Sequence, residues 1–296
     1  MNKKTVFAAI VGRPNVGKSS LTNAILGEKI SIISKKPQTT RNKITGILTK
    51  GEWQYVFFDT PGLHLPKSLL GRYMEKSAKK TIGEVDLTVL MVEPVPKIGE
   101  PERDVLEKTK AIKTPVILAI NKIDTIPKEK ILEVIATYAA EYEFAAVVPV
   151  CAKSGEGVEP LLSELSKYLV ESEFFFPEDM ITDQPERKIA SEIIREKALR
   201  LLDCEIPHGI GVSIEEFKEQ KILSIRAEIF CERESHKSII IGKSGAMIKK
   251  IGSYARQDLE AFFGIPIYLD LWVKVRQKWR DRPNMLNDLG YNEKDL

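Results

Sequence analysis

The segment at residues 12–19 (GRPNVGKS) limits the fold of this chain more than any other part of its sequence. It follows the pattern Gly-x-x-x-x-Gly-Lys-Ser of a loop that wraps around nucleotide phosphates. An apolar run at 6–11 precedes it, as expected of a buried parallel strand, and residues 20–26 after it are typical of a helix. The helix N-terminus would present unpaired N–H groups and the positive end of its dipole to the phosphates. The sequence therefore predicts a nucleotide site at the beginning of an α/β domain.

Residue types within this loop suit separate tasks. Gly12 and Gly17 allow the backbone to approach the phosphate oxygens closely. Lys18 is expected to reach the β- and γ-phosphates, and the hydroxyl of Ser19 to ligate Mg²⁺. The predicted nucleotide contacts are Gly12, Asn15, Val16, Gly17, Lys18, Ser19 and Ser20.

Length and composition restrict the class of protein. With 296 residues, 43% of them apolar and 29% charged, the chain can bury the cores of two domains. The net charge is only +3, so a nucleic-acid surface needs local clusters of positive charge. Three separated cysteines (Cys151, Cys204 and Cys231) disfavour a disulfide framework or a zinc site. No stretch approaches the ~18 apolar residues of a membrane span, so we expect a cytoplasmic protein and leave peripheral association with the inner face of the membrane open.

Two further segments are predicted to complete a magnesium and γ-phosphate site. The polar loop at 35–41 offers the hydroxyls of Thr39 and Thr40, and a loop hydroxyl can ligate Mg²⁺ only while the γ-phosphate is present. Asp59 ends an apolar run and can hold Mg²⁺ through a water, while the N–H of Gly62 can approach the γ-phosphate.

Residues 121–124 (NKID) predict a site for guanine. The carboxylate of Asp124 can accept hydrogen bonds from guanine N1–H and the 2-amino group, whereas adenine would leave this charge unpaired. Asn121 is expected to brace the loop, and Lys122 to lie along the base plane.

A second loop is predicted to reach the base from the end of an apolar run. It carries Cys151, Ala152 and Lys153, and the N–H of Ala152 can contact guanine O6. Cys151 is expected to be a small packed side chain, because no partner motif accompanies it.

Leu63 stands where many GTPases carry a glutamine that orients water. Leucine cannot orient water, so we expect hydrolysis to be slow or to need help. His64 beside it is interpreted as loop surface and receives no role.

Apolar runs alternate with helix-like charged stretches as far as residue 170. Runs at 86–92 and 115–120 are typical of buried strands, and those at 44–49 and 54–59 of an antiparallel hairpin. This alternation predicts an α/β domain at 1–172, with a mixed, mostly parallel sheet covered by helices and closed by a helix at 159–170.

The pattern changes after residue 172. Residues 173–188 contain two prolines and several charges, as in a linker. A helix at 189–202 and three alternating strands then predict a small α+β domain at 189–282, followed by a C-terminal tail at 283–296.

A Gly-x-x-Gly loop precedes an amphipathic helix in this second domain. Such a loop is of the KH type, in which close backbone approach and a helix N-terminus clamp single-stranded RNA. The predicted RNA contacts are Gly242, Lys243, Ser244, Gly245, Lys249 and Lys250. Arg276, Lys278 and Arg280 add positive charge nearby, or form a solvated basic face. Base stacking and ordinary packing are both open for Trp272, Trp279 and Tyr254.

The ordered motifs, with residues 177–187 (PEDMITDQPER) and 191–197 (SEIIREK), resemble the bacterial Era-like family of translation-factor-related GTPases. The resemblance covers residues 4–292 and implies a P-loop GTPase domain followed by an α+β type II KH domain. It places a magnesium ligand at Thr40, giving the set Ser19, Thr40 and Asp59, and implies GTP or GDP and Mg²⁺ as ligands. It further implies a GTP-switched protein that grips the 3′ end of small-subunit ribosomal RNA and assists assembly of the small ribosomal subunit.

Catalytic roles are predicted for Lys18, Thr40, Asp59, Gly62 and Asn15. Relatives with an asparagine at position 15 and an apolar residue after the Asp-x-x-Gly motif use K⁺ near the phosphates, so we hypothesise a K⁺ site here. We expect a monomer. Two alternatives stay open: an RNA-binding protein in which GTP is structural, and a tRNA-directed GTPase, for which a reactive cysteine near the C-terminus is missing.

Overall fold

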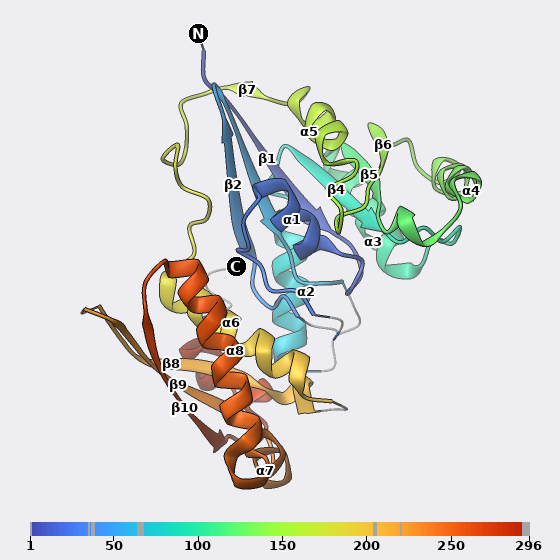
Figure 1. The fold of residues 1–296 in the computed structure, drawn as a ribbon. Coiled ribbons are helices and arrows are strands. Elements are labelled where there is room, and N and C mark those ends of the chain that lie inside the picture. The colour runs from blue at the N-terminus through green and yellow to red at the C-terminus, as the bar shows by residue number, and fades with distance from the viewer. Residues whose placement is uncertain are drawn as a thin grey trace.

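The computed structural model describes residues 2–34, 36, 39–63, 68–203, 206–219 and 221–291, which form two parts, each built on its own sheet (Figure 1). The sheet of the first part has the order β2-β3-β1-β4-β5-β6, with β7 paired to β1. Only β2 and β7 run antiparallel to their neighbours, so the sheet is mixed and mostly parallel, as predicted. Its strands are β1 (Lys4–Val11), β2 (Ile44–Lys50), β3 (Trp53–Asp59), β4 (Leu87–Val92), β5 (Val116–Ile120), β6 (Ala146–Pro149) and β7 (Val170–Glu171).

Helices cover both faces of this sheet because successive strand residues point to opposite sides. Ala8 and Ile10 pack with α1 (Lys18–Leu26) and α5 (Val158–Ser166), whereas Ala9 and Val11 pack with the other three helices. Those are α2 (Leu69–Ile82), α3 (Glu100–Ile112) and α4 (Lys128–Ala139). The nucleotide loop joins β1 to α1, at the carboxyl end of a central strand.

The second part is a three-stranded sheet covered on one face by helices. Its strands β8 (Gly211–Glu219), β9 (Leu223–Cys231) and β10 (Ile267–Val275) have the order β10-β9-β8, with β9 parallel to β10 and antiparallel to β8. The helices are α6 (Glu186–Leu201), α7 (Glu234–Ile241) and α8 (Ala246–Phe263). The order α-β-β-α-α-β is that of the predicted type II KH domain.

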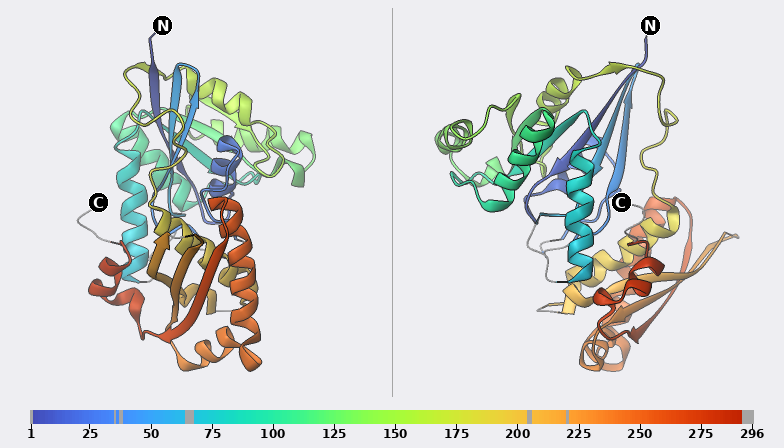
Figure 2. Two further views of the ribbon diagram at one scale, coloured as in Figure 1. Left: turned by 60° about the vertical axis from the view of Figure 1, so that its left-hand side comes forward. Right: turned by 180° about the vertical axis from the view of Figure 1, so that it is seen from behind.

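The connection between the two parts lies against the first sheet (Figure 2). The backbone N–H of Ile47 in β2 donates to Ile181 at 2.9 Å, and the buried amide of Gln54 bonds the backbone of Phe175 and Phe176. Helix α6 starts at Glu186, inside the expected linker of 173–188, because Pro185 is tolerated at a helix start and an acidic first turn suits the dipole.

One prediction about the end of a helix was wrong. The helix expected at 159–170 ends at Ser166, because Val170 pairs with Thr5 at the end of β1 that β4 leaves uncovered. Residues 283–291, expected as part of a tail, include helix α9 (Pro283–Asp288), and Leu286 and Tyr291 are buried against α2. The last five residues, 292–296, lie outside the described part of the chain, as do Cys204 and His64.

No helix within the described residues is long and apolar enough to span a bilayer.

Candidate nucleotide and RNA sites

The phosphate loop has a backbone that only small or permissive residues adopt. Gly12 and Gly17 have φ angles of 148° and 105°, and Asn15 has 64°. A Cβ on Gly12 would lie 2.2 Å from the carbonyl oxygen of Met91, so a side chain there would displace the loop. Helix α1 begins at Lys18, and Gly17 before it provides no side-chain cap, which leaves the first N–H groups of the helix open to an incoming phosphate.

Lys18 is buried at the centre of this loop. Its Nζ donates to the carbonyl oxygens of Gly12 at 3.1 Å and Arg13 at 2.9 Å. Burial lowers the pKa of the Lys18 ammonium to about 8, although Asp59 acts in the opposite direction. An ammonium that is desolvated in this way gains from an anionic phosphate within its reach.

The predicted magnesium ligands come together in the structure. The hydroxyl oxygens of Ser19 and Thr40 are 2.8 Å apart. Asp59 is fully buried at the end of β3, burial raises its carboxyl pKa, and neither carboxylate oxygen has a hydrogen-bond partner among the described residues. Two hydroxyls together with a buried carboxylate fit a hard cation such as Mg²⁺, which prefers oxygen ligands and keeps several waters.

The base-binding loops are joined by Asn121. Its Nδ2 donates to the carbonyl oxygen of Val16 at 2.7 Å, and its Oδ1 accepts from the N–H of Ala152 at 2.9 Å. Asn121 therefore braces three loops at once, as predicted. The Ala152 N–H is already engaged, so guanine O6 would have to share this donor. Asp124 lies exposed in a short 3-10 helix (Ile123–Thr125), available to a base.

The remaining predicted residues of this region differ in their surroundings. Lys122 pairs with Glu93. Cys151 is buried, in agreement with the packing role expected for it. Lys153 is exposed at the mouth of the base site.

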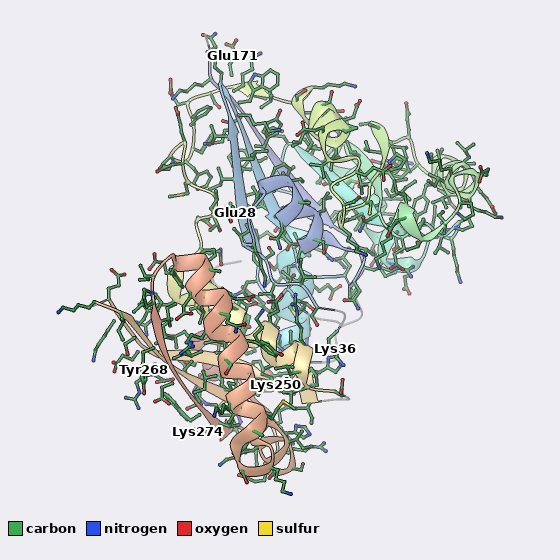
Figure 3. All side chains as sticks on the ribbon, viewed as in Figure 1. Glu28, Lys36, Glu171, Lys250, Tyr268 and Lys274 are labelled. Atoms are coloured by element: carbon green, nitrogen blue, oxygen red, sulfur yellow. The ribbon has the colours of Figure 1, made fainter. Side chains whose placement is uncertain are left out.

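A cavity of about 1070 Å³ joins these loops and is large enough for a nucleotide. It is lined by residues of the phosphate loop, the Thr40 segment and both base loops, and also by Leu199 and Arg200 of α6 and by Asp203, which follows that helix. The sequence did not predict these last three as site residues, because no motif spacing relates α6 to a nucleotide. Figure 3 shows Glu28 and Lys36 on the side of the first part that faces the second.

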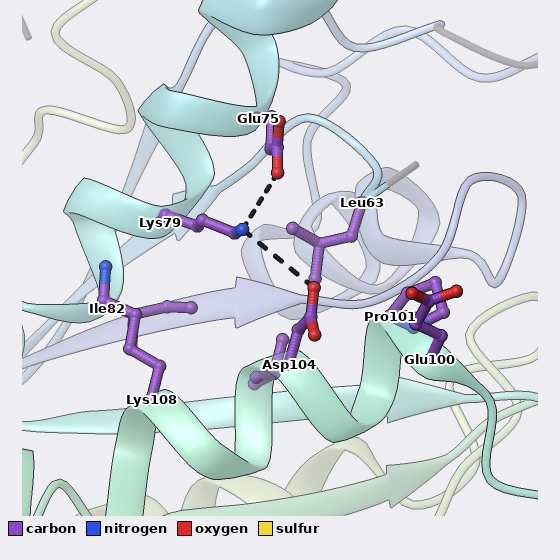
Figure 4. Close-up of a pocket in the computed structure, with 9 residues that line it drawn as sticks. Leu63, Glu75, Lys79, Ile82, Glu100, Pro101, Asp104 and Lys108 are labelled. Carbon is purple, nitrogen blue, oxygen red and sulfur yellow. Dashed lines mark ion pairs between the residues drawn. The ribbon is translucent and has the colours of Figure 1, made fainter. Parts of the chain in front are cut away.

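Leu63 points away from this cavity. It is buried with Ile82 and Val105 between α2 and α3, beside a separate cavity of about 50 Å³ that is too small for a nucleotide (Figure 4). Lys79 bridges the two helices there, at 2.9 Å from Glu75 and 4.0 Å from Asp104. The side chain of Leu63 therefore cannot position a water at the γ-phosphate.

The predicted RNA loop has the geometry of a backbone clamp. Gly242 and Gly245 have φ angles of 73° and 78°, and a Cβ on Gly242 would lie 2.8 Å from the backbone nitrogen of Met247. Helix α8 begins after Gly245 without a side-chain cap, so its first N–H groups are open to a phosphate. Lys243, Ser244, Lys249 and Lys250 are exposed in this loop and in the first turns of α8, and Figure 3 labels Lys250.

Several residues considered for RNA contacts are engaged elsewhere. Trp279 is fully buried and cannot stack on a base. Arg276 pairs with Glu228 at 2.6 Å and Arg280 with Glu232 at 2.8 Å, which reduces the positive charge they offer. Lys278, by contrast, is exposed.

The two remaining aromatic candidates for base stacking, Tyr254 and Trp272, differ in how accessible their rings are. Tyr254 is 44% exposed on α8, while Trp272 lies under the guanidinium of Arg226 at 5.4 Å. Tyr254 is therefore the more accessible of the two rings.

Comparison with known proteins matches both parts of the chain. Residues 7–122 match the family described as 50S ribosome-binding GTPase, and residues 205–280 match the KH domain family. GTPase Era of Ruminiclostridium cellulolyticum is 49% identical over 293 residues, covering 98% of each chain. GTPase Era of Caldanaerobacter subterraneus subsp. tengcongensis is 52% identical over 288 residues, covering 96% of this chain and 97% of the relative.

Two solved structures are similar over the whole chain. A crystal structure of Era in complex with MgGDPNP and nucleotides 1506–1542 of 16S ribosomal RNA has a TM-score of 0.95 at 42% identity. A variant of Aquifex aeolicus Era bound to GDP·AlF4⁻ has a TM-score of 0.94, also at 42% identity. Each comparison covers 98% of this chain and 99% of the other.

Proposed function

The chain belongs to the Era family of GTPases, and from this premise we propose that it uses GTP to control its binding of single-stranded RNA at the 3′ end of small-subunit ribosomal RNA, during assembly of the small subunit. The observation that carries the proposal is contact between the nucleotide site and the KH part: Leu199 and Arg200 of α6 line the nucleotide cavity. The matched family description names the 50S subunit, whereas the solved relative was crystallised with 16S RNA. We give the second more weight because it covers both parts of the chain.

Each proposed role follows from the chemistry of the site. Nucleotide contacts are proposed for Gly12, Asn15, Val16, Gly17, Lys18, Ser19, Ser20, Asp59, Gly62, Asn121, Lys122, Asp124, Cys151, Ala152 and Lys153. Metal ligation is proposed for Ser19, Thr40 and Asp59, and RNA contacts for Gly242, Lys243, Ser244, Gly245, Lys249 and Lys250. Bound Mg²⁺ would neutralise charge on the β- and γ-phosphates.

Hydrolysis is proposed to depend on groups positioned around the phosphates rather than on a side-chain base. Lys18 exchanges its two carbonyl acceptors for phosphate oxygens and stabilises the charge that moves to the leaving group. The Gly62 N–H approaches the γ-phosphate, and a Cβ there would lie 2.8 Å from Pro14, so only glycine fits beside the loop. After the γ-phosphate leaves, Thr40 no longer ligates the metal and moves away from Ser19. The contacts of the Thr40 segment with the KH part then weaken.

A protein that acts on small-subunit RNA in this way works in the cytoplasm, and peripheral contact with the membrane stays a prediction from the sequence. We propose the same domain limits as above, except that α6 begins at Glu186.

The test measures RNA binding in two nucleotide states. Full-length protein with a non-hydrolysable GTP analogue or with GDP is titrated with a labelled oligonucleotide of the 16S 3′ end, and with an equally long tRNA fragment. We expect tighter binding of the 16S oligonucleotide in the GTP-analogue state. Equal affinity in both states, or preference for the tRNA fragment, would contradict the proposal.

A matched pair of charge reversals tests the RNA site. Lys243→Asp places a negative charge in the exposed KH loop, and Lys130→Asp makes the same change on α4 of the first part. Only the first is expected to weaken RNA binding and to lower the dependence of affinity on salt. GTP hydrolysis without RNA should be unchanged in both.

A further inference from the structure

The second part of the chain holds the backbone next to Thr40. Arg195 of α6 has a side chain only 2% exposed, and its Nη2 donates to the carbonyl oxygen of Thr39. The same guanidinium contacts the carboxylate of Glu192, with Nε 3.0 Å from Oε1. Thr40 in turn lies with its hydroxyl 2.8 Å from that of Ser19. One arginine thus connects α6 to the residue that precedes the proposed magnesium ligand.

Other hydrogen bonds join the second part to Arg41, which follows Thr40, and to Ile33, which lies before it in the chain. The buried guanidinium of Arg41 donates to the carbonyl oxygens of Ile210 at 2.7 Å and His208 at 3.3 Å. At the other end, the N–H of Ile33 donates to the fully buried carboxylate of Glu196 at 3.0 Å. The second part therefore holds Thr39 and Arg41, the residues on either side of Thr40.

We propose that Arg195 is a positioning residue for GTP hydrolysis, and that α6 of the KH part thereby completes the magnesium site of the first part. Arg195 touches neither nucleotide nor metal. It acts through the Thr39 carbonyl, which sets where the Thr40 hydroxyl lies. The inference rests on the GTPase activity of the family, and it adds that the activity of this site requires the docked KH part.

An arginine suits this place better than a lysine. A guanidinium presents several N–H groups in a fixed plane and can serve a carboxylate and a carbonyl together, whereas an ammonium is a compact point charge on a flexible stem. Lysine at 195 can still neutralise Glu192, so the buried carboxylate keeps a partner. The change therefore removes the contact with Thr39 while leaving a charge inside the interface.

The experiment uses the full-length chain with Arg195→Lys, Glu192→Gln and a control, Arg187→Lys. Arg187 is exposed on the same helix, and it donates to the carbonyl oxygens of Ile214 and Glu215 in the second part. We measure kcat for GTP, the Mg²⁺ concentration that gives half of the maximal rate, affinity for GDP, and the thermal midpoint. We expect Arg195→Lys to lower kcat about tenfold and to raise the Mg²⁺ requirement, as loss of one charge-assisted hydrogen bond would do.

Affinity for GDP should stay within about twofold, because Thr40 ligates the metal only with the γ-phosphate present. Glu192→Gln, which loosens Arg195 without removing it, should shift kcat and the Mg²⁺ requirement in the same direction and by less. Arg187→Lys should match the wild type.

Two results would overturn the inference. One is a folded Arg195→Lys protein with wild-type kcat and Mg²⁺ dependence. The other is loss of GDP affinity in proportion to kcat, which would mark Arg195 as merely structural. If Arg195→Lys does not fold, Glu192→Gln decides by the same readouts. Absence of GTP hydrolysis in the wild type would instead contradict the GTPase assignment itself, so the two failures are distinguishable.

Discussion

Replacement of Trp279 by alanine is expected to lower the free energy of unfolding by about 4 kcal/mol. The indole is fully buried, meets the ring of Phe230 edge-on at 5.1 Å, and belongs to a cluster with Leu70 of α2 and Leu286 of α9. Burial of a tryptophan removes about 150–250 Å² from water. At about 25 cal/mol per Å² this is worth roughly 4–6 kcal/mol, reduced by a compact denatured state to about the 3–5 kcal/mol measured for such truncations.

A second substitution separates the ring from its hydrogen bond. Trp279 Nε1 donates to the carbonyl oxygen of Gly209 at 2.9 Å. Trp279→Phe keeps an aromatic ring but leaves that buried carbonyl without its donor, at a cost of about 1–3 kcal/mol. Trp53, which is 44% exposed on β3, provides the control, and Trp53→Ala should cost well under half as much as Trp279→Ala.

The assay is urea unfolding of the full-length variants, followed by circular dichroism and analysed for midpoint and slope. A loss below about 1 kcal/mol for Trp279→Ala, similar to the control, would refute the reasoning. If Trp279 instead stacked on RNA, Trp279→Phe would retain full stability and alter only RNA affinity.

Three further outcomes are expected. GTP turnover should be faster in KCl than in NaCl, and Asn15→Gly, which removes the side-chain oxygen but accepts the φ of 64°, should abolish the difference; equal wild-type rates in the two salts would contradict a K⁺ site. Asp124→Asn should reduce GTP affinity by about 10⁴-fold and favour xanthosine nucleotides, because the amide donates where the carboxylate accepts; competition binding with the two nucleotides checks this. Lys29 contacts Asp258 of α8 at 2.8 Å, and its side chain is 38% exposed. A double-mutant cycle of Lys29→Met and Asp258→Asn should therefore give a coupling energy of only about 0.5–1 kcal/mol, which falls with added salt. Additive changes in the free energy of unfolding would show that the pair contributes nothing.

Features governed by local sequence could be predicted. The phosphate loop requires glycine at 12 and 17, where the backbone has positive φ or meets Met91 and Asn121, so its pattern survives as a readable motif. The same holds for the KH loop at 242–245. The hairpin of β2 and β3 was likewise predicted, because its two apolar runs flank a short turn.

Features that depend on contacts between distant segments could not be predicted. Leu199, Arg200 and Asp203 line the nucleotide cavity only because the second part docks beside it. Val170 is not in the helix that was expected to include it, because it pairs with Thr5 at the end of β1 that β4 does not cover. The sequence around Trp279 does not distinguish a ring that stacks on RNA from one that packs in a core. The ring is in a core because residues of α2 pack against it.

Two of the contacts between the parts differ in chemistry, and this difference bears on how the nucleotide can move the KH part. In the first of them, Ile33, Thr39 and Arg41 meet the second part through hydrogen bonds to Glu196, Arg195 and Ile210. Helix α2 meets it through an apolar cluster that includes Tyr73 and Trp279. Polar contacts of a segment next to the γ-phosphate depend on its exact placement, whereas apolar burial is non-directional and tolerates small shifts. Loss of the γ-phosphate should therefore break the polar contact before the apolar one. We expect the KH part to rotate about the apolar cluster at α2.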